Sequence, residues 1–184
     1  IVYSSTALLE LAPPNINTER LVTLMQAEGI TFDDLRSTLA KLEGIRVHVV
    51  GDTIVDSYTY CSMIGGMTKT PTFSVRYENQ KDYVGGAGIV SKHLKAAGAE
   101  VNFSTVLGDD TLKDYVLEDL KNSSISCHPI IDDTRPTTNK NAFIASGYRL
   151  LKVDTLDNRA ISQHVVESLH EVISSVETDV IVFS

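Results

Sequence analysis

The sequence predicts an α/β fold in which helices cover a mainly parallel β-sheet and a small β flap projects from it. Three observations carry this prediction. Apolar, β-branched strands alternate with helical segments from Ile45 onward, as in sheets whose parallel strands are joined by helices. Extended segments within 58–78 and 137–154 interrupt that alternation. The chain is 42% hydrophobic and 22% charged, which is the composition of a globular domain.

The first 44 residues predict a connector followed by two short helices. The stretch "LAPPNIN" within residues 1–17 is interrupted by proline, which favours a loop. Helices are expected over 18–28 and 31–43, the second opened by a Thr-x-x-Asp capping box from Thr31 to Asp34. Its apolar stripe predicts docking on its own domain and comprises Phe32, Leu35, Leu39 and Leu42.

From Ile45 the strands and helices follow one another in a regular order. The expected strands and extended pieces are 45–50, 58–62, 73–78, 100–108, 124–131, 137–145, 148–154 and 179–183. The expected helices run from the Gly85–Gly86 turn to Gly98, over 111–121 and over 158–175. The final "DVIVFS" is typical of a buried parallel strand, and a crossover after it is missing. We therefore expect a fold that is incomplete at the C-terminus, in a fragment of a longer protein.

Composition argues against several classes of protein. The formal net charge is −8, whereas nucleic-acid binding draws on a basic surface. No apolar stretch approaches the ~18 residues of a membrane helix, so neither nucleic acid nor membrane is an expected partner. Cys61 and Cys127 lie far apart, which favours free thiols in a reducing, cytoplasmic environment.

The first candidate site residues follow the strand 45–50. Ligands of open α/β sheets bind beyond the carboxyl ends of the strands, where the turn "GDTIVD" presents Asp52 and Asp56. Two carboxylates there are able to accept hydrogen bonds from neighbouring sugar hydroxyls. The alternative interpretation makes Asp52 a turn residue and Asp56 a solvated loop residue.

The second candidate is the Gly85–Gly86 turn, where a strand leads into a helix. Glycine allows unusual dihedral angles and close approach of a ligand, and the helix directs its positive end at the same space. The spacing of "GGAGIV" does not match a dinucleotide-binding fingerprint, which argues against an oxidoreductase. By pattern alone, this turn fits a structural role equally well.

The third candidate is "RPTTNK", residues 135–140, in which Arg135 and Lys140 bracket two threonines. This basic pair is able to steady a phosphate or a sugar hydroxyl, or else it guards an exposed strand edge. The five histidines form no His-x-x-x-His pair and neither cysteine has a nearby partner. No metal site is therefore expected.

Taken together, three motifs resemble the ribokinase-like (PfkB) carbohydrate kinases over residues 45–184. They are "VHVVGDTIVDSYTY", "VGGAGIVSKHLKAAGAEVNFSTVLGDD" and "RPTTNKNAFIASGYRLLKVD", the last resembling the heptose-phosphate kinase branch. The resemblance implies a ribokinase-like three-layer sandwich with a β flap. It also implies that Asp56, with Asp52 beside it, Gly85, Gly86 and Lys140 bind a sugar or sugar-phosphate substrate. One departure is Ile89, which stands where the family usually has a sugar-binding asparagine.

The front of the chain carries a second, shorter resemblance. "YSSTALLEL" is similar to the end of a cytidylyltransferase-like domain, which implies that Ser4, Ser5 and Thr6 lie near nucleotide phosphates. Residues 1–44 would then be the end of a nucleotidyltransferase-like domain plus a helical linker. Residues 45–184 would be the N-terminal, sugar-binding part of a kinase domain, in a bifunctional enzyme of activated-sugar biosynthesis.

The resemblance also implies what the chain does not contain. The family's catalytic base and ATP site lie on a Gly-x-Gly-Asp-like turn in the C-terminal half, and no glycine follows Gly147 here. No catalytic residue is therefore expected within this chain, which alone would be inactive. ATP and Mg²⁺ are the expected cofactors of the longer parent enzyme. The alternative is a non-catalytic, kinase-like module that serves binding or oligomerisation, and a homodimer formed through the flap is expected under either interpretation.

Overall fold

The structure is a computed structural model that describes residues 16–41, 43–65 and 72–184. It divides into two compact units, Ile1–Lys41 and Leu42–Ser184. Among the described residues, no helix combines the length and the apolar character needed to cross a bilayer. The described part of the first unit consists of helices α2 (Ile16–Glu28) and α3 (Phe32–Ala40). Helix α3 begins with the predicted capping box, in which Thr31 and Asp34 each bond the other's backbone amide.

The second unit contains a fully parallel central sheet. Its strands lie in the order β5-β4-β1-β8, and every neighbouring pair is parallel. The bounds are β1 (Arg46–Val50), β4 (Glu100–Leu107), β5 (Ser126–Ile131) and β8 (Val180–Phe183). The mainly parallel sheet predicted from the apolar runs is confirmed.

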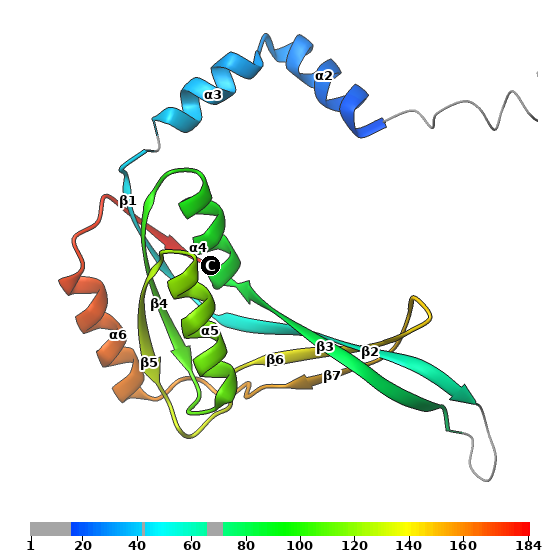
Figure 1. Cartoon of the computed structure of the whole chain (residues 1–184). Coiled ribbons are helices and arrows are strands. Elements are labelled where there is room, and N and C mark those ends of the chain that lie inside the picture. Colours follow the sequence, from blue (N-terminus) through cyan, green and yellow to red (C-terminus); the bar gives the residue numbers. More distant parts are fainter. Residues whose placement is uncertain (1–15, 42, 66–71) are drawn as a thin grey trace, which may run out of the picture. The chain divides into compact units, whose positions relative to one another are not determined.

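Helices cover both faces of this sheet, which gives the predicted three layers (Figure 1). Helices α4 (Ala87–Ala96) and α5 (Thr111–Asn122) lie on one face, and α6 (Gln163–Ser175) lies on the other. The main core fills the space under α4 and α5, and its deeply buried side chains include Val49, Phe103, Leu107, Val116 and Leu120. These apolar residues hold the carboxyl ends of β1 and β4 in a fixed position.

A second, separate sheet forms the flap, with its strands in the order β3-β2-β6-β7. The bounds are β2 (Thr53–Gly65), β3 (Ser74–Gly86), β6 (Asn139–Ala145) and β7 (Tyr148–Thr155). Its long hairpin extends away from the central sheet (Figure 1). The prediction of a flap outside the central sheet is confirmed, although β2 and β3 are longer than the expected pieces.

Two boundaries differ from the predictions for identifiable reasons. Strand β2 begins at Thr53, so Asp56 lies within a strand and not in the expected loop. The inward face of β2 carries small polar residues such as Ser57 and Thr59, whose hydroxyls bond Asp82 and Asn141. Helix α6 begins at Gln163, after its N-cap Ser162, because the preceding residues form a loop.

Candidate sugar-binding site

The structure brings two of the predicted site residues into direct contact. Ile54 pairs with Gly85, and Asp56 pairs with Tyr83, across the β2–β3 hairpin. A Cβ atom added to Gly85 would lie 2.5 Å from Asp56 Oδ2 and 3.4 Å from the carbonyl oxygen of Ile54. Gly85 therefore leaves the space that the Asp56 carboxylate occupies, and this requirement is one of room and not of backbone conformation.

Gly86 and Asp52 are also brought together, but through the backbone. Gly86 has φ of +59° and is the N-cap of α4, a conformation that glycine adopts at little cost. The Asp52 carbonyl accepts a 2.8 Å hydrogen bond from the Ala87 amide, and a Cβ on Gly86 would collide with that carbonyl. The first amide of α4 is thus already engaged, and Gly86 serves to join β3 to the helix.

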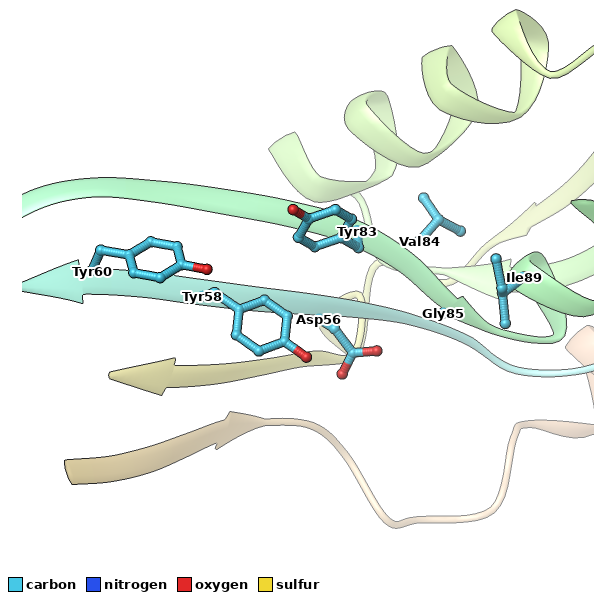
Figure 2. Close-up of a pocket in the computed structure, with 7 residues that line it drawn as sticks. All are labelled: Asp56, Tyr58, Tyr60, Tyr83, Val84, Gly85 and Ile89. Atoms are coloured by element: carbon cyan, nitrogen blue, oxygen red, sulfur yellow. The ribbon is translucent and has the colours of Figure 1, made fainter. Parts of the chain in front are cut away.

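A cavity of about 460 Å³ opens beside the Asp56 carboxylate (Figure 2). It is lined by Asp56, Tyr58, Tyr60, Tyr83, Val84, Gly85 and Ile89. The rings of Tyr58 and Tyr83 meet edge to face with centroids 5.8 Å apart. A concave site with aromatic walls and few polar groups has the composition of a small-molecule pocket.

Sequence reasoning missed the three tyrosines of this cavity. Tyr58 and Tyr60 follow Asp56 at two-residue spacing, and alternate residues of a strand lie on the same face. Tyr83 lies two residues before Gly85 on the partner strand. The signal was present, but it required β2 to be continuous through Asp56.

Lys140 lies next to Asp56 on the sheet without lining the cavity. The parallel register of β2 and β6 pairs these two residues, and Lys140 in turn pairs with Asp154 of β7. Lys81 is paired with Tyr58 on the other side of β2, and its amine lies 6.0 Å from the centroid of the Tyr60 ring. The face that carries Asp56 therefore has a lysine on each neighbouring strand.

Asp52 lines a different, more polar cavity of about 280 Å³. Its lining comprises Asp52, Thr53, Val106, Arg135, Pro136, Thr138, Asp157, Asn158, Arg159 and Ile161. The two aspartates of "GDTIVD" thus face separate spaces, although the sequence suggested a single site for both.

Arg135 is held by its own surroundings. Its Nε bonds Asp132 at 2.9 Å, and its guanidinium also donates to the carbonyls of Arg159 and Ala160 at 3.3 and 3.1 Å. Arg159 in turn bonds Asp157 and the carbonyl of Thr134, and its guanidinium lowers the pKa of Asp157 to about 2. Arg135 therefore fastens one loop to another, whereas Lys140 lies on β6 beside Asp56, so the two basic side chains of "RPTTNK" lie in different surroundings.

Asp110, the second aspartate of "LGDD", positions the "RPTT" segment. Its carboxylate accepts hydrogen bonds from the amides of Lys113 at 3.0 Å and Thr137 at 2.8 Å. The Thr137 hydroxyl accepts a 3.0 Å bond from the Gly108 amide. Burial alone would raise the pKa of Asp110, but these amide hydrogen bonds outweigh it and lower that pKa. The segment leading into β6 is therefore fixed to the end of β4.

Three remaining expectations concern a nucleotide site, a metal site and the reactivity of a cysteine. Ser4, Ser5 and Thr6 lie outside the described residues, so their nucleotide-binding role stays a prediction. In the described part of the chain, no group of three or more His, Cys, Asp or Glu side chains is placed to hold a metal. Burial raises the pKa of Cys127 to about 12, so its thiol is a poor nucleophile at neutral pH.

Comparison with known proteins identifies the family of the second unit. Residues 45–181 match the model of the pfkB family carbohydrate kinases. The bifunctional protein HldE of Campylobacter fetus is 29% identical over 133 residues, which are 71% of this chain and 29% of the relative. HldE of Paramagnetospirillum magneticum is 35% identical over 115 residues, which are 62% of this chain and 24% of the relative.

Solved structures agree with this result at the level of the fold. A putative sugar kinase from Clostridium perfringens has a TM-score of 0.57 at 16% identity, over 72% of this chain and 42% of that one. Phosphofructokinase-2 from Escherichia coli, in complex with fructose-6-phosphate, has a TM-score of 0.58 at 16% identity, over 76% and 45%. The chain spans less than half the length of the relatives cited here. From the match over residues 45–181, the chain belongs to the pfkB family of carbohydrate kinases.

Proposed function

We propose that residues 45–184 form the acceptor-binding part of an ATP-dependent sugar or sugar-phosphate kinase. The observation that carries this proposal is the Asp56 carboxylate, which lies against Gly85 at the wall of an aromatic cavity. A carboxylate offers two oxygens as hydrogen-bond acceptors, so Asp56 is suited to orient neighbouring hydroxyls of a sugar. Phosphoryl transfer depends mainly on such positioning and on charge stabilisation.

ATP and Mg²⁺ would supply the phosphoryl group and the charge neutralisation in the full-length enzyme. The described residues offer no cluster of carboxylates for the metal, and we assign no nucleotide or metal ligand among them. The role of this region is to hold the acceptor hydroxyl. On this proposal the catalytic base and the anion-binding turn belong to a segment that the 184 residues do not include.

The lysines that flank Asp56 favour a phosphorylated acceptor among the possible sugars. Lys140 pairs with Asp56 in register and Lys81 pairs with Tyr58, so each lies on a strand next to β2, beside a residue that lines the cavity. A phosphate on the sugar would gain charge-assisted hydrogen bonds from these amines. Lys140→Met should therefore weaken a sugar phosphate more than the same sugar without phosphate, and the difference should shrink as salt is added.

Direct binding to the chain tests the proposal. We expect weak binding of monosaccharides or their phosphates in calorimetry or ligand-observed NMR, abolished by Asp56→Ala. Asp133→Ala is the matched control, since Asp133 is an exposed aspartate on a loop away from the cavity. Sugar binding that Asp56→Ala leaves unchanged would place the acceptor elsewhere.

The parent enzyme is proposed to be bifunctional. The relatives from C. fetus and P. magneticum are both named bifunctional proteins, which supports assigning residues 1–44 to the end of a nucleotidyltransferase-like domain and its helical linker. The kinase part would then begin near Ile45. Limited proteolysis of the full-length protein should cut preferentially within residues 29–44, leaving a protected fragment that begins near Ile45.

A second proposed role is pairing of two chains through the flap. The face of the flap opposite Asp56 carries apolar side chains. Phe143 of β6 pairs with Thr59 of β2 and with Leu151 of β7, and Thr59 points to the face opposite that of Asp56. Leu151 is 56% exposed and Phe73 is 71% exposed, and both line an apolar groove of about 240 Å³. We expect Leu151→Lys to lower the mass measured by light scattering from dimer to monomer. A wild-type monomer at high concentration would argue against this pairing.

A further inference from the structure

The cavity beside Asp56 has chemically different ends. Asp56 is the one carboxylate among its lining residues and lies against the backbone of Gly85, and beyond Gly85 stands the hydrocarbon side chain of Ile89 (Figure 2). Ile89 is 39% exposed, so part of its side chain remains open to an incoming molecule. Ile89 cannot accept or donate a hydrogen bond.

The tyrosines provide a third kind of surface. Tyr58 comes from β2 and Tyr83 from β3, and their edge-to-face contact fixes the relative orientation of the two rings. Aromatic faces favour C–H groups, and the ring edges remain compatible with polar neighbours. A pyranose has this division, with C–H bonds on its faces and hydroxyls around its rim.

We infer that the preferred acceptor is a sugar with a deoxygenated edge: a methyl, methylene or otherwise hydroxyl-free carbon that faces Ile89. The inference rests on the proposed function of the site. The sugar would give a hydroxyl to Asp56 and lay a C–H face against Tyr58 and Tyr83. A sugar hydroxyl placed against Ile89 would lose its hydrogen bonds to water and gain no hydrogen bond from the protein, which disfavours fully hydroxylated sugars in that orientation.

A panel of monosaccharides tests this selection on the 184-residue chain. The probes are D-glucose, D-mannose and D-galactose together with their monodeoxy analogues, compared by saturation-transfer NMR and calorimetry. We expect at least one deoxy analogue to bind about 2- to 12-fold more tightly than its parent, the ratio that corresponds to one neutral hydrogen bond. Ile89→Asn should reverse that preference by a similar factor, because its amide can bond the added hydroxyl.

The aromatic contact is tested separately at Tyr58. Tyr58→Phe keeps the ring and should leave affinity within about 3-fold, whereas Tyr58→Leu should weaken every sugar in the panel by about 5-fold or more. Tyr148→Leu is the matched control, since Tyr148 is 76% exposed on β7 and does not line the cavity. Equal effects of Tyr58→Leu and Tyr148→Leu would refute stacking at this wall.

The outcomes separate this inference from the function on which it rests. If sugars bind and Asp56→Ala abolishes their binding, but Ile89→Asn leaves the order of affinities unchanged, the deoxygenated edge is refuted and the sugar site stands. If no sugar in the panel binds in an Asp56-dependent way, the proposed function of the chain fails with it. Ile89→Thr serves as a second variant, with circular dichroism to check its folding, should Ile89→Asn not fold.

Discussion

Replacing Gly85 with alanine should disable sugar binding while leaving the fold intact. The added Cβ would lie 2.5 Å from Asp56 Oδ2, where ordinary van der Waals contact begins near 3.4 Å. The carboxylate therefore has to retreat by about 0.9 Å, the difference between these two distances. The same displacement stretches a 2.8 Å hydrogen bond from a sugar hydroxyl to about 3.7 Å, which is no longer a hydrogen bond.

The expected loss follows from the charge on that bond. A hydrogen bond to an ionised group contributes about 1.5–3 kcal/mol, so Gly85→Ala should weaken the sugar about 10- to 150-fold. Stability should change by less than about 1.5 kcal/mol, because the atom closest to the new Cβ is the end of a side chain that can rotate away. Calorimetry with the best-binding sugar and thermal unfolding of the same variant measure the two quantities.

A double-mutant cycle gives the sharpest form of this test. If Gly85→Ala acts only through the Asp56 carboxylate, it should have almost no further effect in an Asp56→Ala background, which makes the two losses strongly non-additive. Additive losses in the cycle would refute the proposed contact. A large fall in stability for Gly85→Ala alone would instead mean that the hairpin cannot accommodate the methyl group.

Three more predictions concern the stability of the framework and the binding of nucleotide. Burial, and then the neighbouring His128, lower the pKa of His48 in the folded protein. Below pH 6.5 the unfolded chain therefore binds more protons than the folded chain does. As the pH is lowered through this range, the free energy of unfolding should fall by up to about 1.4 kcal/mol per pH unit. Chemical denaturation across pH should show a shallower slope for His48→Gln but not for the exposed His164→Gln. Asp110→Ala should cost about 2–4 kcal/mol of stability through its helix cap and the Thr137 amide, whereas Asp109→Ala, which loses a surface ion pair, should cost under about 1 kcal/mol in the same denaturation. Calorimetry of the 184-residue chain with ATP and Mg²⁺ should show no binding, and micromolar affinity, about −8 kcal/mol, would place a nucleotide site within this chain.

Most of the fold could be predicted because its signals are local. The parallel strands are apolar runs, the helix caps are short motifs such as Thr31–Asp34, and Gly86 precedes a helix at positive φ. The start of α6 was predicted too early, because the loop before it is held by distant contacts of Arg135 with the carbonyls of Arg159 and Ala160. No pattern of hydrophobic residues within that loop could indicate these bonds.

The candidate site was harder to predict, and strand β2 shows why. Its inward residues include Ser57 and Thr59, which are 1% and 3% exposed although both are polar. They are buried because Asp82, Gln80 and Asn141 satisfy their hydroxyls, and these partners come from two other strands. A search for apolar alternation therefore starts the strand too late, at residue 58 instead of Thr53, and leaves Asp56 in a loop.

The same error explains why the two aspartates of "GDTIVD" were assigned to one site. In a loop, Asp52 and Asp56 would both be free to turn toward one ligand. In the structure the strand starts between them, so the Asp56 side chain is fixed on the tyrosine face of β2. Asp52 remains before the strand, where its carbonyl caps α4 and the residue lines the neighbouring polar cavity. Because that second cavity also holds the arginine-bound loop, Asp52→Asn should affect sugar affinity much less than Asp56→Asn, and equal effects in calorimetry would mean that the two cavities act as one.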